Sequence, residues 1–124
     1  MMVNKQKWLL RALGAGATLG FFLMFASIIH AFISGDLSIE GPQLANMPWG
    51  IVSLVDIYLG LLLFSIWVLW RENFGPAGLA WFLLVVVLGN LLSCMYILKA
   101  LREARGDVQK FWLGKHASRE AGDV

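Results

Sequence analysis

The sequence predicts an all-α integral membrane protein in which three transmembrane helices pack as a bundle, followed by a short charged tail. Hydrophobic residues make up 59% of the 124 residues and charged residues only 15%, whereas a soluble domain has about 25% charged residues. The apolar residues form long runs, and about 20 such residues suffice for a helix to cross a hydrocarbon core. Because lipid offers no partners for backbone N–H and C=O groups, such runs are expected to be helical.

Three apolar runs define the predicted spans, at residues 8–33, 49–70 and 77–98. A segment rich in glycine and proline, residues 34–48, separates the first two and is expected to be a loop. A short polar turn at 71–76 separates the last two. The first run is much longer than the apolar core of a signal peptide, so we expect it to be retained as a span.

Tryptophans and charges support these boundaries. Trp8, Trp49 and Trp70 lie at predicted span ends, where an amphipathic ring prefers to sit at the membrane interface. Residues 1–101 form the predicted membrane domain, in which strong helix formers just after the third span extend it by a turn or two. Residues 102–124 form the charged tail, expected to be partly helical or disordered.

The basic residues give a contradictory topology. The first loop contains Asp36 and Glu40 but no Lys or Arg, so it is expected outside and the N-terminus in the cytoplasm. Three crossings would then leave the tail outside, although its basic residues favour the cytoplasm. We give more weight to the first span and loop. The residues in conflict are Lys5, Lys7 and Arg11 before the first span and Lys99, Arg102, Arg105 and Lys110 after the third.

Asp56 is the most informative polar residue, because it lies seven residues inside the second span. A carboxylate at the centre of a span costs about 2.5–3.5 kcal/mol, so such groups usually face a partner inside the bundle. With antiparallel spans, polar residues of the other two helices reach the same leaflet. The predicted polar cluster consists of Asp56, His30, Asn90, Ser27, Ser53 and Ser93.

Two interpretations of this cluster stay open. It could hold the polar head of a lipid-like ligand or exchange a proton between Asp56 and His30. Alternatively, its groups only form hydrogen bonds between helices, each worth about 0.6 kcal/mol. The neighbouring charges of the second turn, Arg71 and Glu72, are expected to be a solvated pair.

Four glycines are predicted to allow close approach of helices. Gly16 and Gly20 have the small-xxx-small spacing of helix–helix contacts. Gly60 and Gly89 are expected to serve the same purpose in the second and third spans. These contacts form either within one chain or along a homodimer seam.

A combined pattern covers spans two and three. It consists of Trp49, Asp56, Tyr58, Gly60, Trp67, Glu72, Gly89, Asn90 and Tyr96. Over residues 48–101 this pattern resembles a family of small bacterial and plant membrane proteins that is known only as a domain of unknown function. The resemblance implies a three-helix membrane protein, and with it a place in a bacterial inner membrane, but no activity. The first span and the charged tail are not part of it.

Composition and motifs exclude several other classes. A net charge of +2 is too small to indicate nucleic-acid binding, and the single cysteine, Cys94, allows no internal disulfide. The sequence has no metal-ligand spacing and no phosphate-binding glycine loop. We therefore expect neither a metal nor a cofactor.

The favoured function is binding without catalysis. The protein would bind a lipid-like ligand or a membrane partner around Asp56, with membrane lipids, a homo-oligomer or a larger membrane complex as partners. One alternative is an enzyme that acts on an isoprenoid-like substrate with Asp56 as acid or base. Small membrane-embedded isoprenoid cyclases are loosely similar, but their proline-glutamate motif is missing. The other alternative is an oligomer that conducts protons or ions past Asp56.

Overall fold

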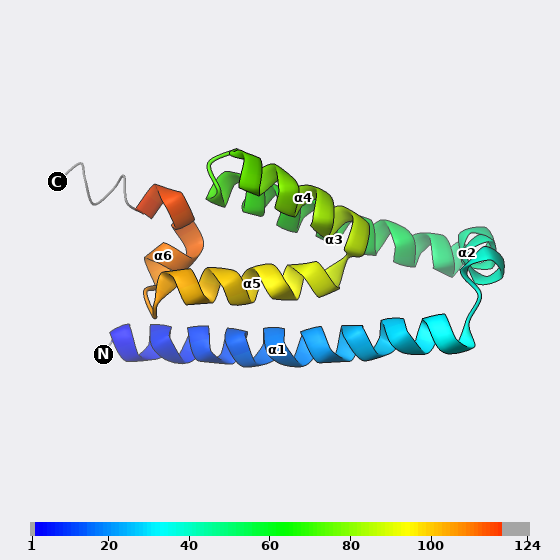
Figure 1. Cartoon of the computed structure of the whole chain (residues 1–124), viewed down its shortest axis with the longest axis horizontal. Coiled ribbons are helices and arrows are strands. Elements are labelled where there is room, and N and C mark those ends of the chain that lie inside the picture. The colour runs from blue at the N-terminus through cyan, green and yellow to red at the C-terminus, as the bar shows by residue number, and fades with distance from the viewer. Residues whose placement is uncertain (1, 118–124) are drawn as a thin grey trace.

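The computed structural model describes residues 2–117, with side chains from residue 6 onward, and this part of the chain consists of helices joined by short turns (Figure 1). The prediction of an all-α fold is confirmed. Six helices and one 3-10 turn follow in order: α1 (Met2–Ser34), α2 (Leu37–Asn46), α3 (Pro48–Arg71), α4 (Pro76–Leu88), α5 (Asn90–Ala104), α6 (Val108–Leu113) and η1 (Gly114–His116).

Two of these helices are long and apolar enough, by length and composition, to cross a membrane. They are residues Gln6–Ser34 of α1 and the whole of α3, Pro48–Arg71. At 1.5 Å per residue, α3 is about 36 Å long and α1 is longer still, against a hydrocarbon core of about 30 Å. Both helices coincide with the first two predicted spans.

The predicted loop between these spans contains a helix. The side chain of Asp36 accepts a hydrogen bond from the Ser38 N–H at 2.9 Å and so caps the start of α2. Glu40 follows in the first turn, where its negative charge favours the positive end of the helix dipole. These two signals at the helix start outweigh the proline inside the segment, Pro42. The expectation of an irregular loop is therefore wrong.

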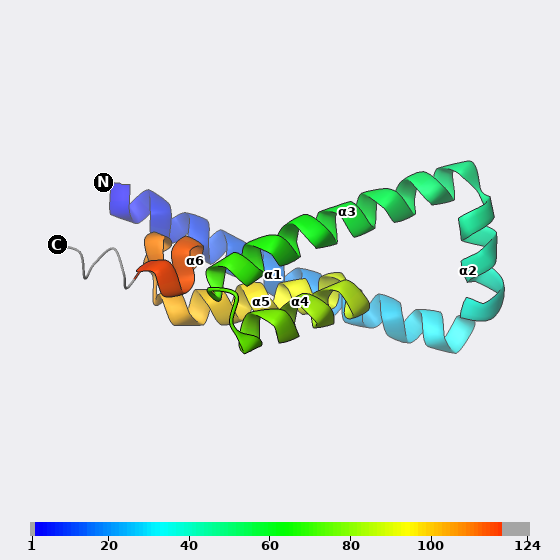
Figure 2. The same cartoon turned by 90° about the horizontal axis from the view of Figure 1, so that it is seen from above.

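The single third helix predicted over 77–98 is also wrong, because the chain reverses at Gly89. This residue has φ 73° and ψ −147°, a backbone conformation that is available essentially only to glycine. A side chain added there would meet no atom within 4 Å, so Gly89 makes a turn rather than a close helix contact. Helix α4, with 13 residues, is about 20 Å long, too short to cross a core of about 30 Å. Helix α5 returns beside it (Figure 2).

The main core lies where the first half of α1, the end of α3, α5 and α6 meet. Its buried members are Leu10, Val68, Tyr96, Ala100, Ala104 and Phe111. The small alanines of α5 let α1 pack closely along it, and Gly20 of α1 lies against Cys94, whose Sγ is 3.1 Å from the position of an added Cβ. Gly16 and Gly60 have no such neighbour. Towards α2, α1 and α3 diverge (Figure 2).

The tail predicted from residue 102 folds onto the bundle as far as it is described. Residues 102–104 complete α5, and α6 begins at an Asp107 cap whose side chain accepts from the Gln109 N–H at 2.9 Å. Phe111 of α6 is buried in the main core. The rest of the predicted tail, residues 118–124, lies outside the described residues.

Candidate functional site: a buried charge network beside an amphipathic cavity

Arg71, the last residue of α3, is the centre of a buried polar network. Its side chain is only 1% exposed. Its Nε donates to the Phe111 carbonyl at 2.7 Å, and Nη2 donates to the Lys110 carbonyl at 3.4 Å. Nη1 donates to the Tyr96 hydroxyl at 3.1 Å and to Glu103 Oε2 at 3.2 Å. One guanidinium thus joins α3 to both α5 and α6.

Glu72 is the buried anion of this network, with a side chain 5% exposed. Its Oε1 accepts from the Tyr96 hydroxyl at 2.9 Å and from Lys99 Nζ at 3.3 Å. Lys115 Nζ lies 3.7 Å from Oε2. The expected solvated Arg71–Glu72 pair is therefore wrong, because α6 and η1 cover the turn. A carboxylate can be buried here because several cations and a hydroxyl compensate for its lost hydration.

Glu103 closes the network on its exposed side. It pairs with Lys99 at 2.8 Å and with Arg71 at 3.2 Å, while its side chain stays 48% exposed. Partial burial raises the pKa of the Glu103 carboxyl, but hydrogen bonds and charges from Lys99 and Arg71 outweigh this effect. The pKa therefore lies below its ordinary value.

Aromatic rings hold Tyr96 in place. Its side chain is fully buried, and the rings of Trp81 and Trp67 contact it edge-on with centroid distances of 5.3 and 6.0 Å. Such contacts add about 0.5–1.5 kcal/mol beyond the area buried. They fix the hydroxyl where it can accept from Arg71 and donate to Glu72.

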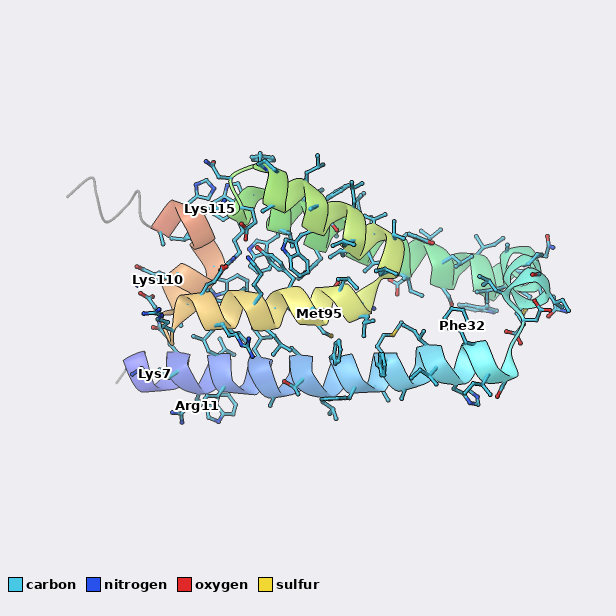
Figure 3. All side chains as sticks on the ribbon, in the orientation of Figure 1. Lys7, Arg11, Phe32, Met95, Lys110 and Lys115 are labelled. Carbon is cyan, nitrogen blue, oxygen red and sulfur yellow. The ribbon has the colours of Figure 1, made fainter. Side chains whose placement is uncertain are left out.

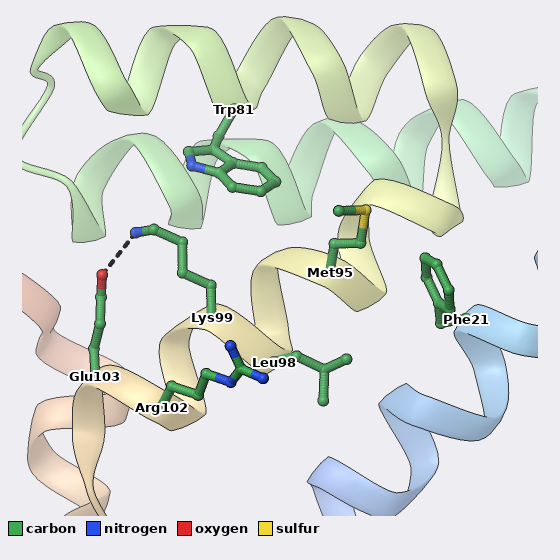
Figure 4. Close-up of a pocket in the computed structure, with 7 residues that line it drawn as sticks. All are labelled: Phe21, Trp81, Met95, Leu98, Lys99, Arg102 and Glu103. Atoms are coloured by element: carbon green, nitrogen blue, oxygen red, sulfur yellow. Dashed lines mark ion pairs between the residues drawn. The ribbon is translucent and has the colours of Figure 1, made fainter.

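An open cavity of about 640 Å³ lies next to this network, between α1, α4 and α5 (Figure 4). One part of its lining is apolar and the other is charged. The Lys99–Glu103 ion pair borders the charged part, and Arg102 reaches toward the cavity beside Leu98. Arg102 has no ion pair within the described residues. The lining residues are Phe21, Trp81, Met95, Leu98, Lys99, Arg102 and Glu103.

In the described part of the chain, the residues of the polar cluster predicted around Asp56 do not come together. Asp56 and His30 are exposed on α3 and α1, and Asn90 is exposed at the start of α5. Within residues 2–117 no hydrogen bond or ion pair connects any two members of the cluster. The physical reason is that α2 separates α1 from α3 at this end, while α5 turns back at residue 89.

Two of the three serines of that cluster form a hydrogen bond within their own helix. The Ser27 hydroxyl donates to the Leu23 carbonyl at 2.8 Å, and the Ser53 hydroxyl donates to the Trp49 carbonyl at 2.9 Å, each within its own helix. Ser93 is buried and its hydroxyl has no partner.

The residues of the pattern that resembles the family lie in three parts of the structure. Trp67, Glu72 and Tyr96 meet in the network, while Gly89 and Asn90 form the turn between α4 and α5. The remaining members lie exposed along the first half of α3; they are Trp49, Asp56, Tyr58 and Gly60.

Sequence reasoning missed the roles of Arg71, Lys99, Glu103 and Phe111. One signal was available: Tyr96, Lys99 and Glu103 are spaced three and four residues apart, which puts them on one face of a helix. No local pattern indicated that Phe111 would return to cover Arg71, since this contact spans forty residues.

The family described as "Protein of unknown function (DUF1475)" matches residues 10–116. The chain belongs to this family. No curated protein and no solved structure matches it.

The DUF1475 match confirms the resemblance to a domain of unknown function and extends it. The resemblance was limited to residues 48–101, whereas the match also includes most of α1 and the tail as far as His116. Every residue of the charge network and of the cavity lies within it.

Proposed function

We propose that the protein crosses a bacterial inner membrane twice, through α1 and α3, and inserts α4 and α5 as a hairpin that enters and leaves on one side. The lengths of α1 and α3 support two crossings. The shortness of α4 and the reversal at Gly89 support the hairpin. Exposed large apolar residues occur along α1, α3 and α4, as a lipid-facing surface requires, whereas α5 contributes Met95.

This arrangement removes the conflict between the basic N-terminus and the basic tail. Lys7, Arg11, Lys110 and Lys115 all lie toward the same end of the molecule (Figure 3). With two crossings and a hairpin, both regions would face the cytoplasm, as the positive-inside rule favours. Lys5, the remaining basic residue of the N-terminus, has no described side chain.

We further propose that the protein binds an anionic amphiphile, such as a phospholipid, in the cavity of Figure 4. The observation that carries this proposal is the division of one cavity into an apolar part and a charged part, in which Arg102 is the cation without an ion pair within the described residues. Phe21, Met95 and Trp81 would contact the apolar chains, and each buried CH₂ contributes about 0.8 kcal/mol. Arg102 would meet the anionic head in a charge-assisted hydrogen bond.

The proposal moves the binding site away from Asp56, which does not line this cavity. An isoprenoid enzyme with Asp56 as acid or base, or a conducting oligomer, needs further groups near that carboxylate. Within the described residues it has no hydrogen bond or ion pair. Binding at the basic end therefore has more support than either alternative.

Native mass spectrometry of the detergent-solubilised full chain tests the binding proposal. We expect phosphatidylglycerol to bind more tightly than phosphatidylcholine, and Arg102→Gln to weaken phosphatidylglycerol about tenfold, the equivalent of one charge-assisted hydrogen bond. Lys110→Gln, which removes a cation outside this cavity, is the matched control. Equal affinity for both lipids, or equal loss in both variants, would contradict the proposal.

The topology has a test of its own. In a Cys94→Ser background, single cysteines at Gln6, Gln43 and Gln109 are labelled in sealed membranes with an impermeant maleimide. We expect positions 6 and 109 to react from one side and position 43, on α2, from the other. Labelling of positions 6 and 109 from opposite sides would restore a third crossing.

A further inference from the structure

A second, smaller cavity lies where the start of α1 meets the end of α5. It has a volume of about 320 Å³ and shares no lining residue with the cavity of Figure 4. Two leucines form its apolar wall, one of them the buried core residue Leu10. The full lining consists of Lys7, Leu10, Arg11, Leu101, Arg105 and Gly106.

Three exposed basic residues line this cavity, and no acidic residue is part of its lining. Lys7, Arg11 and Arg105 form no ion pair within the described residues, whereas Arg71 and Lys99 are both paired with acidic residues. The acidic residues closest in sequence to Arg105 are engaged elsewhere: Glu103 in the network and Asp107 as the cap of α6. Like charges that share one cavity repel each other unless an anion lies between them.

The backbone at this cavity is held in an uncommon conformation. Arg105 ends α5 with φ 50° and ψ 42°, in the left-handed region, and is followed by Gly106 with φ 83°. Glycine or asparagine is the usual residue for such a helix end. An arginine here accepts backbone strain and lines the same cavity as Lys7 and Arg11, as is typical of residues kept for binding.

We propose that this cavity is an anion site that takes a phosphate group, and that it acts separately from the cavity of Figure 4. Cations that only orient a membrane protein need to lie near the interface, whereas these three residues line one cavity. A phosphate oxygen accepts charge-assisted hydrogen bonds from both arginines and from the lysine. The apolar wall of Leu10 and Leu101 suits a lipid, whose headgroup carries the phosphate; free phosphate offers the same chemistry to the cations.

The test measures binding stoichiometry on the detergent-solubilised full chain by native mass spectrometry, with short-chain phosphatidylglycerol as the lipid probe and inorganic phosphate as the free anion. We expect two lipids per wild-type chain. Arg102→Gln should leave the second site intact, so failure of the first site and failure of this one are distinguishable. Arg11→Gln with Arg105→Asn should weaken the second site at least tenfold while the first remains.

The two probes separate the possible sources of the phosphate group. Lipid binding that inorganic phosphate does not displace supports a lipid headgroup, and displacement by inorganic phosphate supports a free anion. The proposal is overturned if neither probe binds at a site sensitive to Arg11 and Arg105, or if Lys110→Gln weakens binding equally. Arg105→Asn also relieves the strained backbone, so its thermal midpoint without ligand should not fall, and the loss of binding is then not a folding defect.

Discussion

Two acidic residues, Asp56 within α3 and Glu72 directly after it, lie in opposite surroundings. Glu72 is at the packed end, where the first half of α1, the end of α3, α5 and α6 meet, and its carboxylate contacts Arg71, Tyr96 and Lys99. Asp56 is toward the open end, formed by α2 and the adjoining halves of α1 and α3. Its side chain is exposed and has no hydrogen bond or ion pair within the described residues.

The difference follows from the number of elements that meet at each end. A buried carboxylate is stable only when several donors replace its lost hydration, and one helix can supply few of them. At the packed end, donors come from α3, α5 and η1. At the open end, α1 and α3 diverge and no further described helix except α2 lies between them. Helix α5 and the tail together therefore decide where charge can be buried.

The largest expected effect comes from removing the cation of the packed end. Arg71→Met leaves Glu72 with fewer compensating charges and two backbone carbonyls without their donor. We expect a loss of about 3–5 kcal/mol in the free energy of unfolding, as for other broken buried ion pairs, measured by denaturant unfolding in mild micelles. Arg102→Met, an exposed cation on α5, is the control and should change it by less than about 0.5 kcal/mol. Similar values for both variants would contradict the buried network.

Two glycines of the tail sharpen the role of α6 and η1. Both have positive φ, 57° at Gly114 and 83° at Gly106, so alanine is strained at either position, and at Gly114 the ψ of −121° adds to this strain. A Cβ at Gly114 would also clash with the side chain of Arg71 and lie 2.7 Å from its carbonyl oxygen, whereas Gly106 faces open space. We therefore expect Gly114→Ala to destabilise by about 1–3 kcal/mol more than Gly106→Ala in thermal unfolding. Equal losses of thermal stability in the two variants would show that Gly114 does not pack closely against Arg71.

The pH dependence tests the exposed side of the network. Because the folded-state pKa of Glu103 is lowered, its ionised form stabilises the protein above the unfolded pKa of about 4.3. This contribution is lost as the pH falls through the folded pKa. Since Glu103 is about half exposed, we expect it to be worth at most about 1 kcal/mol.

The measurement compares unfolding at pH 7 and at about pH 3.5. Glu103→Gln should show a smaller difference between the two pH values than the wild type. Asp56→Asn, which removes an exposed carboxylate without a hydrogen bond or ion pair among the described residues, is the control and should behave as the wild type does. An unchanged pH dependence in Glu103→Gln would remove Glu103 from the stabilising network.

The smallest effect is expected at the open end. Asp56→Asn keeps the shape of the side chain and removes its charge, so the free energy of unfolding in micelles should change by less than about 0.5 kcal/mol. Binding of phosphatidylglycerol should be retained, because Asp56 does not line the cavity. Loss of binding or of a self-associated form, measured by native mass spectrometry, would mean that a partner covers this end and would revive the alternatives based on Asp56.

Much of the local structure was predictable from the sequence. The apolar runs of α1 and α3 predicted these helices, because a contiguous run of apolar residues indicates both the helix and its length. The polar site was not predictable in the same way. Asp56 was conspicuous because it interrupts an apolar run, whereas Glu72 beside Arg71 looked like an ordinary turn pair. Chain position alone does not reveal which carboxylate is covered.

By itself, the sequence determined the helical class, the two long apolar helices and membership of a family of unknown function. Only the tertiary structure decided that the third apolar run turns back at Gly89 and that Phe111 returns to cover Arg71. Helix formation depends on residues a few positions apart. The reversal of the chain at Gly89 and the burial of Arg71 depend on contacts between segments far apart in the sequence. These contacts form only once α5 has packed on α1 and the tail has packed on both.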